Sequence, residues 1–182
     1  MTPFYTADGD QGDTGYLGKG RISKSSLRIE AVGNVDEATA AIGLARALSV
    51  GEKTQTILLT TQKQLYILMS ELSASPETAS KFDKLDQSHI QWLEEHIKDV
   101  EDSIELPREF IIPGGTSASG ALALARTIVR RAERRAVAML EAELIHKSSL
   151  IAYLNRLSSL LFVLELYETV ISGKTIQLTK EA

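Results

Sequence analysis

The sequence of 182 residues contains no cysteine, which excludes disulfide bonds, thiolate metal ligands and a cysteine nucleophile. It has no excess of positive charge: the formal net charge is −4 at pH 7, which argues against non-specific binding to nucleic acid. Neither a run of about 18 apolar residues for a membrane span nor the basic, then apolar, start of a signal peptide is present. These absences predict a cytoplasmic protein.

The length is that of one domain, with enough chain to bury a sizeable core. We expect a single helical-bundle domain over residues 1–182, made of an N-terminal loop at 1–25, a bundle at 26–172 and a C-terminal tail at 173–182. Within the bundle, apolar residues recur at helical spacing in five segments, each bounded by capping or breaking residues. These predict helices at residues 27–48, 54–74, 86–102, 118–142 and 149–171. The predicted fold class is therefore all-α, a five-helix up-and-down bundle of ferritin-like type.

The last predicted helix is apolar nearly all round, so two of its faces should be buried. In a bundle of this size, we expect the second face to meet another subunit. Asn155 falls on that second face, where a buried partner or a ligand should satisfy its amide.

The connection before the fourth helix combines the apolar run Phe110-Ile111-Ile112 with a turn at Pro113 and a cap at Thr116 or Ser117. The helix that follows begins with free N–H groups, which suit an anion. Along it, an arginine-rich edge is predicted to form from Arg126, Arg130, Glu133 and Arg134, whereas Arg131 and Arg135 should point toward solvent. Guanidinium groups beside a carboxylate suit a polyphosphate and its metal, although an ordinary solvated helix face shows the same pattern.

The first 25 residues are rich in glycine, aspartate and serine and show neither a helical nor a strand period, so we expect a loop. Its glycines permit close approach to a phosphate, and Lys19, Arg21 and Lys24 supply positive charge. A disordered terminus is the plainer alternative. A calcium loop is excluded because residues 12 and 13 are Gly12 and Asp13, the reverse of the order that an EF-hand needs.

Two other motif fragments carry no function. Residues 172–175 end like a phosphate-binding loop, but they lack its leading glycine and follow a helix. Glu143 and His146 have the Glu-x-x-His spacing of a di-iron carboxylate bundle, but the motif occurs once and its partner glutamates are missing.

The chain resembles the PduO-type ATP:cob(I)alamin adenosyltransferases. The resemblance rests on TADGDQGDTG at residues 6–15, EAVGNVDE at 30–37, FIIPGG at 110–115, ARTIVRRAERR at 125–135 and YLNRLS at 153–158. These blocks follow the family's order across most of the chain. The resemblance implies a homotrimer of five-helix bundles that transfers the 5′-deoxyadenosyl group of ATP to the cobalt of cob(I)alamin and releases triphosphate.

The resemblance also implies roles for individual residues. The residues that match the family's N-terminal nucleotide loop are Thr6, Gly9, Asp10, Gly12, Thr14, Gly15 and Lys24. Those that match its helix residues around ATP and Mg2+ are Arg130, Glu133, Arg134 and Asn155. Arg130, Glu133 and Lys24 are the expected catalytic residues, with Glu133 at the metal or the polar edge of the nucleotide.

Three further residues match other parts of the family's pattern. Asp36 and Arg126 correspond to a pair across the subunit interface, and Phe110 corresponds to an aromatic beside the cobalamin. The nucleotide loop departs from the pattern where Ala7 replaces a common arginine, and where Asp8 and Asp13 replace frequent threonines. With less positive charge, the loop is expected to bind ATP more weakly or to depend more on Mg2+ and Lys24.

Cob(I)alamin is a strong nucleophile, so the protein needs to position and shield the reactants rather than supply a base. A cobalamin reductase and an adenosylcobalamin-dependent enzyme are the expected protein partners. A different class of function, a nucleotide-sensing or corrinoid-carrying bundle without catalysis, is compatible with the same residues.

Overall fold

The structure is a computed structural model and describes residues 5–180. The ends of the predicted loop and tail, residues 1–4 and 181–182, lie outside the described residues. Between residues 5 and 180, six helices and two strands follow one another: β1 (Asp13–Gly15), β2 (Arg21–Ser23), α1 (Leu27–Leu48), α2 (Glu52–Ser73), α3 (Ala79–Phe82), α4 (Gln87–Glu101), α5 (Ser117–Glu141) and α6 (Ser149–Ile171).

The five long helices confirm the sequence prediction, and their bounds differ from the predicted ones by no more than two residues. Two short elements were missed. The N-terminal segment, predicted as an irregular loop, contains the antiparallel pair β1–β2, with Thr14 opposite Ile22. The link between α2 and α4, predicted as irregular, contains the single helical turn α3.

Side chains cap the starts of α1, α4 and α5, three of the six helices in the described residues. Ser26 accepts a hydrogen bond from the backbone N–H of Ile29 at the start of α1, and Thr116 accepts one from Ser119 at the start of α5. α2 begins after Gly51, which has no capping side chain. There the buried carboxylate of Glu168, from α6, accepts hydrogen bonds from the backbone N–H groups of Val50 and Gly51, at 3.0 and 3.1 Å. A distant acid thus supplies the cap that the local sequence lacks.

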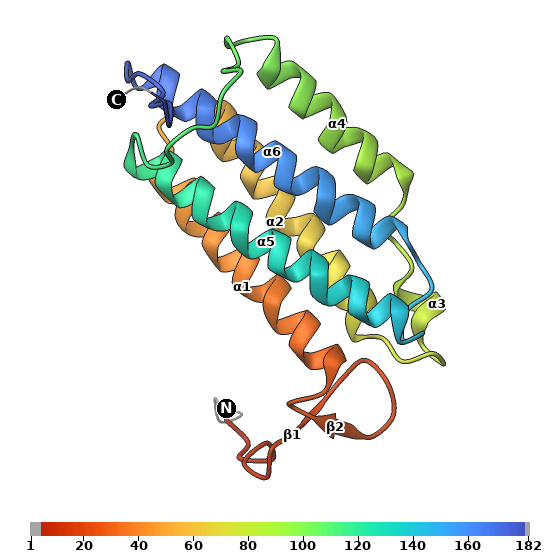
Figure 1. Ribbon diagram of the computed structural model, residues 1–182. Coiled ribbons are helices and arrows are strands. Elements are labelled where there is room, and N and C mark those ends of the chain that lie inside the picture. The colour runs from red at the N-terminus through yellow and green to blue at the C-terminus, as the bar shows by residue number, and fades with distance from the viewer. Residues whose placement is uncertain (1–4, 181–182) are drawn as a thin grey trace.

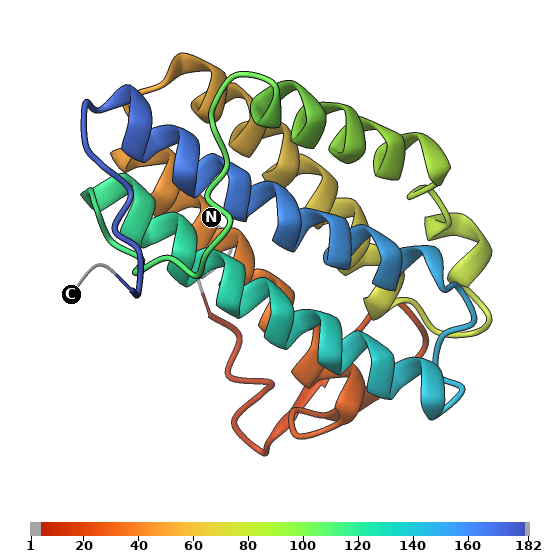
Figure 2. The same ribbon diagram turned by 45° about the horizontal axis from the view of Figure 1, so that its top comes forward.

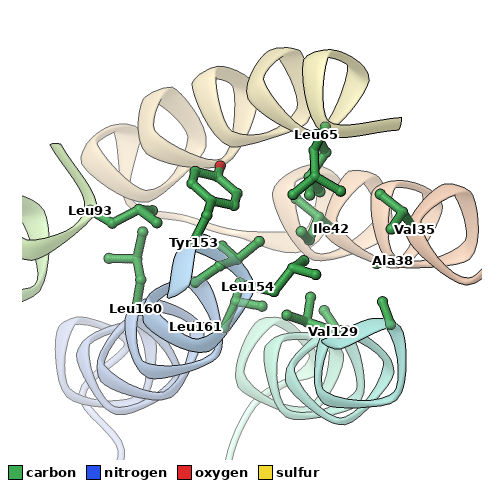
Figure 3. Packing of buried hydrophobic residues seen from close by; sticks show 14 of the residues in the cluster. Val35, Ala38, Ile42, Leu65, Leu93, Val129, Tyr153, Leu154, Leu160 and Leu161 are labelled. Carbon is green, nitrogen blue, oxygen red and sulfur yellow. The ribbon is translucent and has the colours of Figure 1, made fainter. Parts of the chain in front are cut away.

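Successive long helices alternate in direction, so the bundle is of the up-and-down type (Figure 1). In cross-section they lie in the order α2, α1, α5, α6, α4, and each helix packs on the next one in this row. Side chains from all five form one hydrophobic cluster (Figure 3), in which Leu65, Ile42, Val129 and Leu154 are fully buried. Tyr153 lies in the same cluster and its hydroxyl group donates to Gln64, at 2.8 Å.

The second apolar face of α6 is only partly covered within the chain, and its coverage by another subunit stays a prediction. α4 packs against it, and Figure 3 shows Leu93 of α4 facing Leu160 of α6. Leu166 is only 1% exposed, whereas Phe162 remains partly open to solvent and Val170 is exposed. α6 is long and apolar enough to cross a membrane, with a mean hydropathy of 1.4, but 61% of that stretch is buried in the bundle, as in the core helix of a soluble protein.

The two polar connections lie at opposite ends of the bundle (Figures 1 and 2). The β1–β2 hairpin sits beside the start of α1 and is fixed to the end of α2, where Leu17 N–H donates to the carbonyl of Ser73, at 3.1 Å. The segment at residues 105–115, between α4 and α5, lies at the other end, beside the tail that follows α6. We call these the N-terminal loop (residues 6–24) and the Phe110 segment (residues 105–115).

Candidate active site

A cavity of about 690 Å³ opens between the Phe110 segment and the helices α5 and α6. Its apolar wall includes Phe110, Ile111, Phe162 and Val163. Its charged residues are Arg126 and Arg130 of α5 together with Glu101, Arg108 and Glu109. The cavity therefore combines a hydrophobic surface large enough for a flat organic ring system with positive charge for an anionic group.

The two arginines lie one turn apart on α5 and differ in their surroundings. Arg130 is exposed, and within residues 5–180 its guanidinium group makes no hydrogen bond or ion pair. Arg126 is partly buried, lies over the ring of Phe162 at 5.9 Å, and has a buried Nε without a partner in the described chain. Both groups thus retain donors for a ligand or a neighbouring chain. For the buried Nε of Arg126, the lack of a partner is the exception among buried polar groups.

One to two turns further along α5, Glu133 meets Asn155 of α6. The Asn155 amide donates from Nδ2 to Glu133 Oε1 at 3.0 Å, and Asn155 Oδ1 accepts from Arg156 at 3.1 Å. Asn155 is exposed, which corrects the expectation of a buried amide: a neighbouring carboxylate satisfies it at the surface. Arg134 donates from Nη1 to the carbonyl of Arg130, at 2.9 Å. The predicted group Arg130, Glu133, Arg134 and Asn155 therefore does form one surface on α5 and α6.

Arg131 and Arg135 were predicted to point toward solvent, but both side chains have partners on a neighbouring helix. Arg131 donates to Asn34 Oδ1 at 2.8 Å and pairs with Glu37, and Arg135 lies 3.6 Å from Glu30. All three partners belong to α1, which packs along α5. Helical periodicity placed these arginines away from the core stripe correctly, but it gave no indication that an acidic helix lies beside them.

The N-terminal loop is held by its own basic residues. Lys24 Nζ donates to the carbonyl of Gly9 at 2.7 Å, and the backbone N–H of Lys24 donates to the carbonyl of Gly12 at 2.9 Å. Gly12 has a φ of 84°, in the left-handed region that favours glycine. Arg21 is occupied by Asp13, at 3.0 Å, and this ion pair lowers the pKa of the Asp13 carboxyl. Lys24 has no ion-pair partner within residues 5–180, whereas Arg21 has one in Asp13, so Lys24 is the better candidate for contacting a ligand.

The structure does not bring the N-terminal loop to the arginine group of the same chain. Among residues 5–180, no hydrogen bond or ion pair joins the loop to Arg130, Glu133, Arg134 or Asn155. Asp36, predicted to meet Arg126, is exposed on α1 and has no such contact in the described chain either. One chain thus contains the parts of the predicted site without assembling them.

Phe110 has an exposed fraction of 87%, the largest of the exposed apolar side chains in the described residues. It lines the cavity together with Phe162, a residue that the sequence argument had assigned only to packing. The sequence also gave no indication of Glu165, which is 2% exposed and lies near enough to Arg126 to interact with it electrostatically. Burial raises the pKa of Glu165 to about 7, and the charge of Arg126 opposes that rise.

We predict that Glu165→Gln stabilises the protein at alkaline pH. Because the pKa of Glu165 is raised in the folded state, the folded protein ionises this group later than the unfolded chain does. Its burial therefore costs free energy increasingly as the pH rises from about 4.5 through 7. At pH 8 the variant should unfold with a free energy larger by on the order of 2 kcal/mol, and at pH 5 the gain should be much smaller.

Urea unfolding at both pH values and one protein concentration measures this effect, with the exposed Glu95→Gln as the matched control. The same gain at pH 5 and pH 8 would mean that ionisation of Glu165 is not its source.

Comparison with known proteins places these features in one family. The family model described as cobalamin adenosyltransferase matches residues 4–168. A corrinoid adenosyltransferase of Bacillus subtilis is 41% identical over 163 residues, covering 87% of this chain and 82% of the relative. A cobalamin adenosyltransferase of Cupriavidus metallidurans is 40% identical over 167 residues, covering 90% and 86%.

Solved structures agree with the sequence relatives. A variant PduO-type ATP:corrinoid adenosyltransferase from Lactobacillus reuteri, complexed with cobalamin and ATP, superposes with a TM-score of 0.89 at 30% identity, covering 98% of this chain and 100% of that one. A second variant of that protein, complexed with ATP, superposes with a TM-score of 0.88.

Proposed function

The chain belongs to the cobalamin adenosyltransferase family and is an ATP:corrinoid adenosyltransferase, and from this premise we propose that its active site is shared between two chains of a homotrimer. One chain contributes the N-terminal loop, and its neighbour contributes the arginine group and the Phe110 cavity. The observation that carries the proposal is the separation of these parts within one chain.

The geometry of the bundle supports this proposal. The N-terminal loop is fixed at the end where α2 stops, and the Phe110 segment lies at the end where α5 starts. α1 and α2 have 22 residues each, which corresponds to about 33 Å at 1.5 Å per residue. The reaction requires the nucleotide and the corrinoid to touch. A loop from the neighbouring chain can reach the cavity, whereas the loop of the same chain is held at the far end.

The outer face of α1 has the character of an interface in this arrangement. Gly33, Ala40 and Leu44 are partly or fully exposed on it, and they flank the exposed acid Asp36. Small and apolar residues around one charge suit close contact with a complementary surface. Arg126, with its unpartnered Nε, is the complement that we assign to Asp36 of the next chain. In a closed ring of three chains, this head-to-tail contact would occur three times.

Within the shared site, we assign the triphosphate to the loop and the arginines. The backbone N–H groups and hydroxyls of the loop surround the phosphates, and Lys24 adds charge from the same side. The residues with this role are Thr6, Gly9, Asp10, Gly12, Thr14 and Gly15. Arg130 and Arg134 approach from the neighbouring chain. Positive groups from the two chains thus lie on opposite sides of the triphosphate.

Glu133 fits the proposed Mg2+ site. Mg2+ is commonly held by one or two carboxylates together with substrate phosphates, so a single glutamate beside the triphosphate is a sufficient protein ligand. No group of three or more His, Asp or Glu residues that could hold a metal occurs within residues 5–180. Mg2+ would neutralise part of the triphosphate charge, and Asn155 would orient Glu133 through the hydrogen bond of 3.0 Å.

In the transfer itself, the cobalt of cob(I)alamin donates an electron pair to C5′ of ATP while the C5′–O bond breaks and triphosphate leaves with that bonding pair. Negative charge therefore grows on the leaving oxygen. The guanidinium of Arg130 and the ammonium of Lys24 are preorganised to stabilise this charge. The apolar wall at Phe110 and Phe162 excludes water from the cobalt.

The second prediction concerns Phe110. Phe110→Ala should lower the fraction of bound cob(II)alamin in the four-coordinate form and slow adenosylation from that oxidation state by on the order of tenfold, with little change in the affinity for ATP. The reason is that the exposed ring supplies the apolar surface that keeps a lower ligand away from cobalt.

Electron paramagnetic resonance of the bound corrinoid measures the four-coordinate fraction. Phe82→Ala, an aromatic substitution in α3 at the other end of the bundle, is the control. Equal four-coordinate fractions in variant and parent would remove Phe110 from this role.

One assay tests the proposed function as a whole. The protein is incubated with ATP and chemically reduced cobalamin, with Mg2+ or with EDTA, and the corrinoid spectrum is followed. Conversion that depends on Mg2+ supports the proposal, whereas binding without conversion would support the corrinoid-carrier alternative. We further propose a cytoplasmic location, a cobalamin reductase that supplies the reduced corrinoid, and an adenosylcobalamin-dependent enzyme that takes the product.

A further inference from the structure

The C-terminal tail pairs with the Phe110 segment. Beyond α6, the backbone N–H of Ile112 donates to the carbonyl of Gln177 at 2.8 Å, and the N–H of Thr179 donates to the carbonyl of Phe110 at 2.9 Å. Between them, Ile111 and Leu178 form an antiparallel bridge. Figures 1 and 2 show the tail beside the connection between α4 and α5. The two hydrogen bonds therefore bracket the residue next to Phe110.

The direction of the tail is set by the end of α6. Gly173 has a φ of 67°, its N–H donates to the carbonyl of Val170, and the N–H of Lys174 donates back to Thr169 at 3.1 Å. This left-handed turn reverses the chain and sends it toward the Phe110 segment. The segment itself is exposed along most of its length, and Gly114, with a φ of 100°, gives its far end a conformation that only glycine adopts freely. The tail thus forms two backbone hydrogen bonds and one antiparallel bridge with an exposed connection.

We propose that the tail is a positioning element for the corrinoid step: the Gln177 carbonyl and the Thr179 N–H hold the backbone on both sides of Ile111, and so aim Phe110 into the cavity. This inference rests on the proposed function, because it requires Phe110 to face the corrinoid. It assigns a role in adenosylation to residues 174–180, which contribute little to the buried core of the bundle.

Thr179→Pro tests the proposal in the full-length chain, because proline removes the N–H that donates to Phe110. Thr179→Ala is the matched control, since it removes the side chain and keeps the donor. Two readouts are needed: amide hydrogen exchange of residues 105–115, and the four-coordinate fraction of bound cob(II)alamin together with the KM values for cobalamin and ATP.

The proposal predicts that Thr179→Pro speeds exchange in residues 105–115 at least several-fold, lowers the four-coordinate fraction and raises the KM for cobalamin, while the KM for ATP stays at the parent value. Thr179→Ala should match the parent in each respect. Unchanged exchange would show that the tail does not hold the segment, and faster exchange with an unchanged corrinoid step would show that holding it has no catalytic role. Failure of the proposed function is separate: in that case the parent itself would form no adenosylcobalamin, and the exchange result would still stand.

Discussion

Arg130→Ala is expected to lower kcat/KM at limiting ATP by about 30- to 1,000-fold while the fold is retained. Loss of one preorganised charge donor from a transition state costs about 2–4 kcal/mol, and each 1.36 kcal/mol is a factor of ten in rate. The leaving triphosphate gains charge as the C5′–O bond breaks, so the guanidinium contributes more in the transition state than in the bound substrate.

The stability of this variant should be close to that of the parent. Arg130 is exposed, and its guanidinium holds no partner within the described residues that the substitution would leave unpaired. Thermal unfolding of the apo protein checks this point.

Arg135→Ala is the matched control, because it makes the same charge change on the same helix, on the side that faces Glu30 of α1. It should keep the parent's turnover. If Arg130→Ala also turns over at the parent's rate when ATP is limiting, Arg130 has no part in stabilising the leaving group.

The bundle was predictable from the sequence because each long helix carries its own local information. An apolar period, or in α6 a continuous apolar stretch, indicates the helix, and a cap or break such as Asp86 before α4 or Gly173 after α6 marks an end. The hairpin β1–β2 and the turn α3 were not predictable in this way: elements of three or four residues are too short to show a period.

The errors at the site have a common physical cause. Periodicity tells which side of a helix is apolar but not which element packs against that side. Asn155 was therefore expected to be buried, and Arg131 was expected to face solvent, because the positions of Glu133 and Glu37 in space were unknown. The contact of the tail with the Phe110 segment joins residues more than 60 positions apart, and no local pattern announces it.

The sequence predicted which residues belong to the site better than it predicted how these residues come together in space. Arg126 and Arg130 do share a cavity with Phe110, and Glu133 does meet Asn155. The contact between this group and the N-terminal loop follows neither from the sequence pattern nor from the structure of one chain. The proposed active site therefore requires a second chain to provide that contact.

Mixing two inactive variants tests this central claim most directly. Lys24→Ala removes the loop cation and Arg130→Ala removes the helix cation, and each variant alone is expected to keep no more than about 3% of the parent's activity, from the loss of about 2 kcal/mol or more. The two are dissociated together in equal amounts, reassembled, and assayed with ATP, Mg2+ and reduced cobalamin, with subunit exchange confirmed by mass. If sites are shared, a site is intact where an Arg130→Ala chain gives its normal loop to a Lys24→Ala chain with its normal helix.

Random assembly makes about one site in four intact, since each of the two chains at an interface has an even chance of being the required variant. We predict that about a quarter of the parent's activity returns in the reassembled mixture as a whole, about a third in the mixed trimers and none in the unmixed ones. If each chain instead holds a whole site, every site carries one lesion, and mixed oligomers that remain inactive would contradict the shared site.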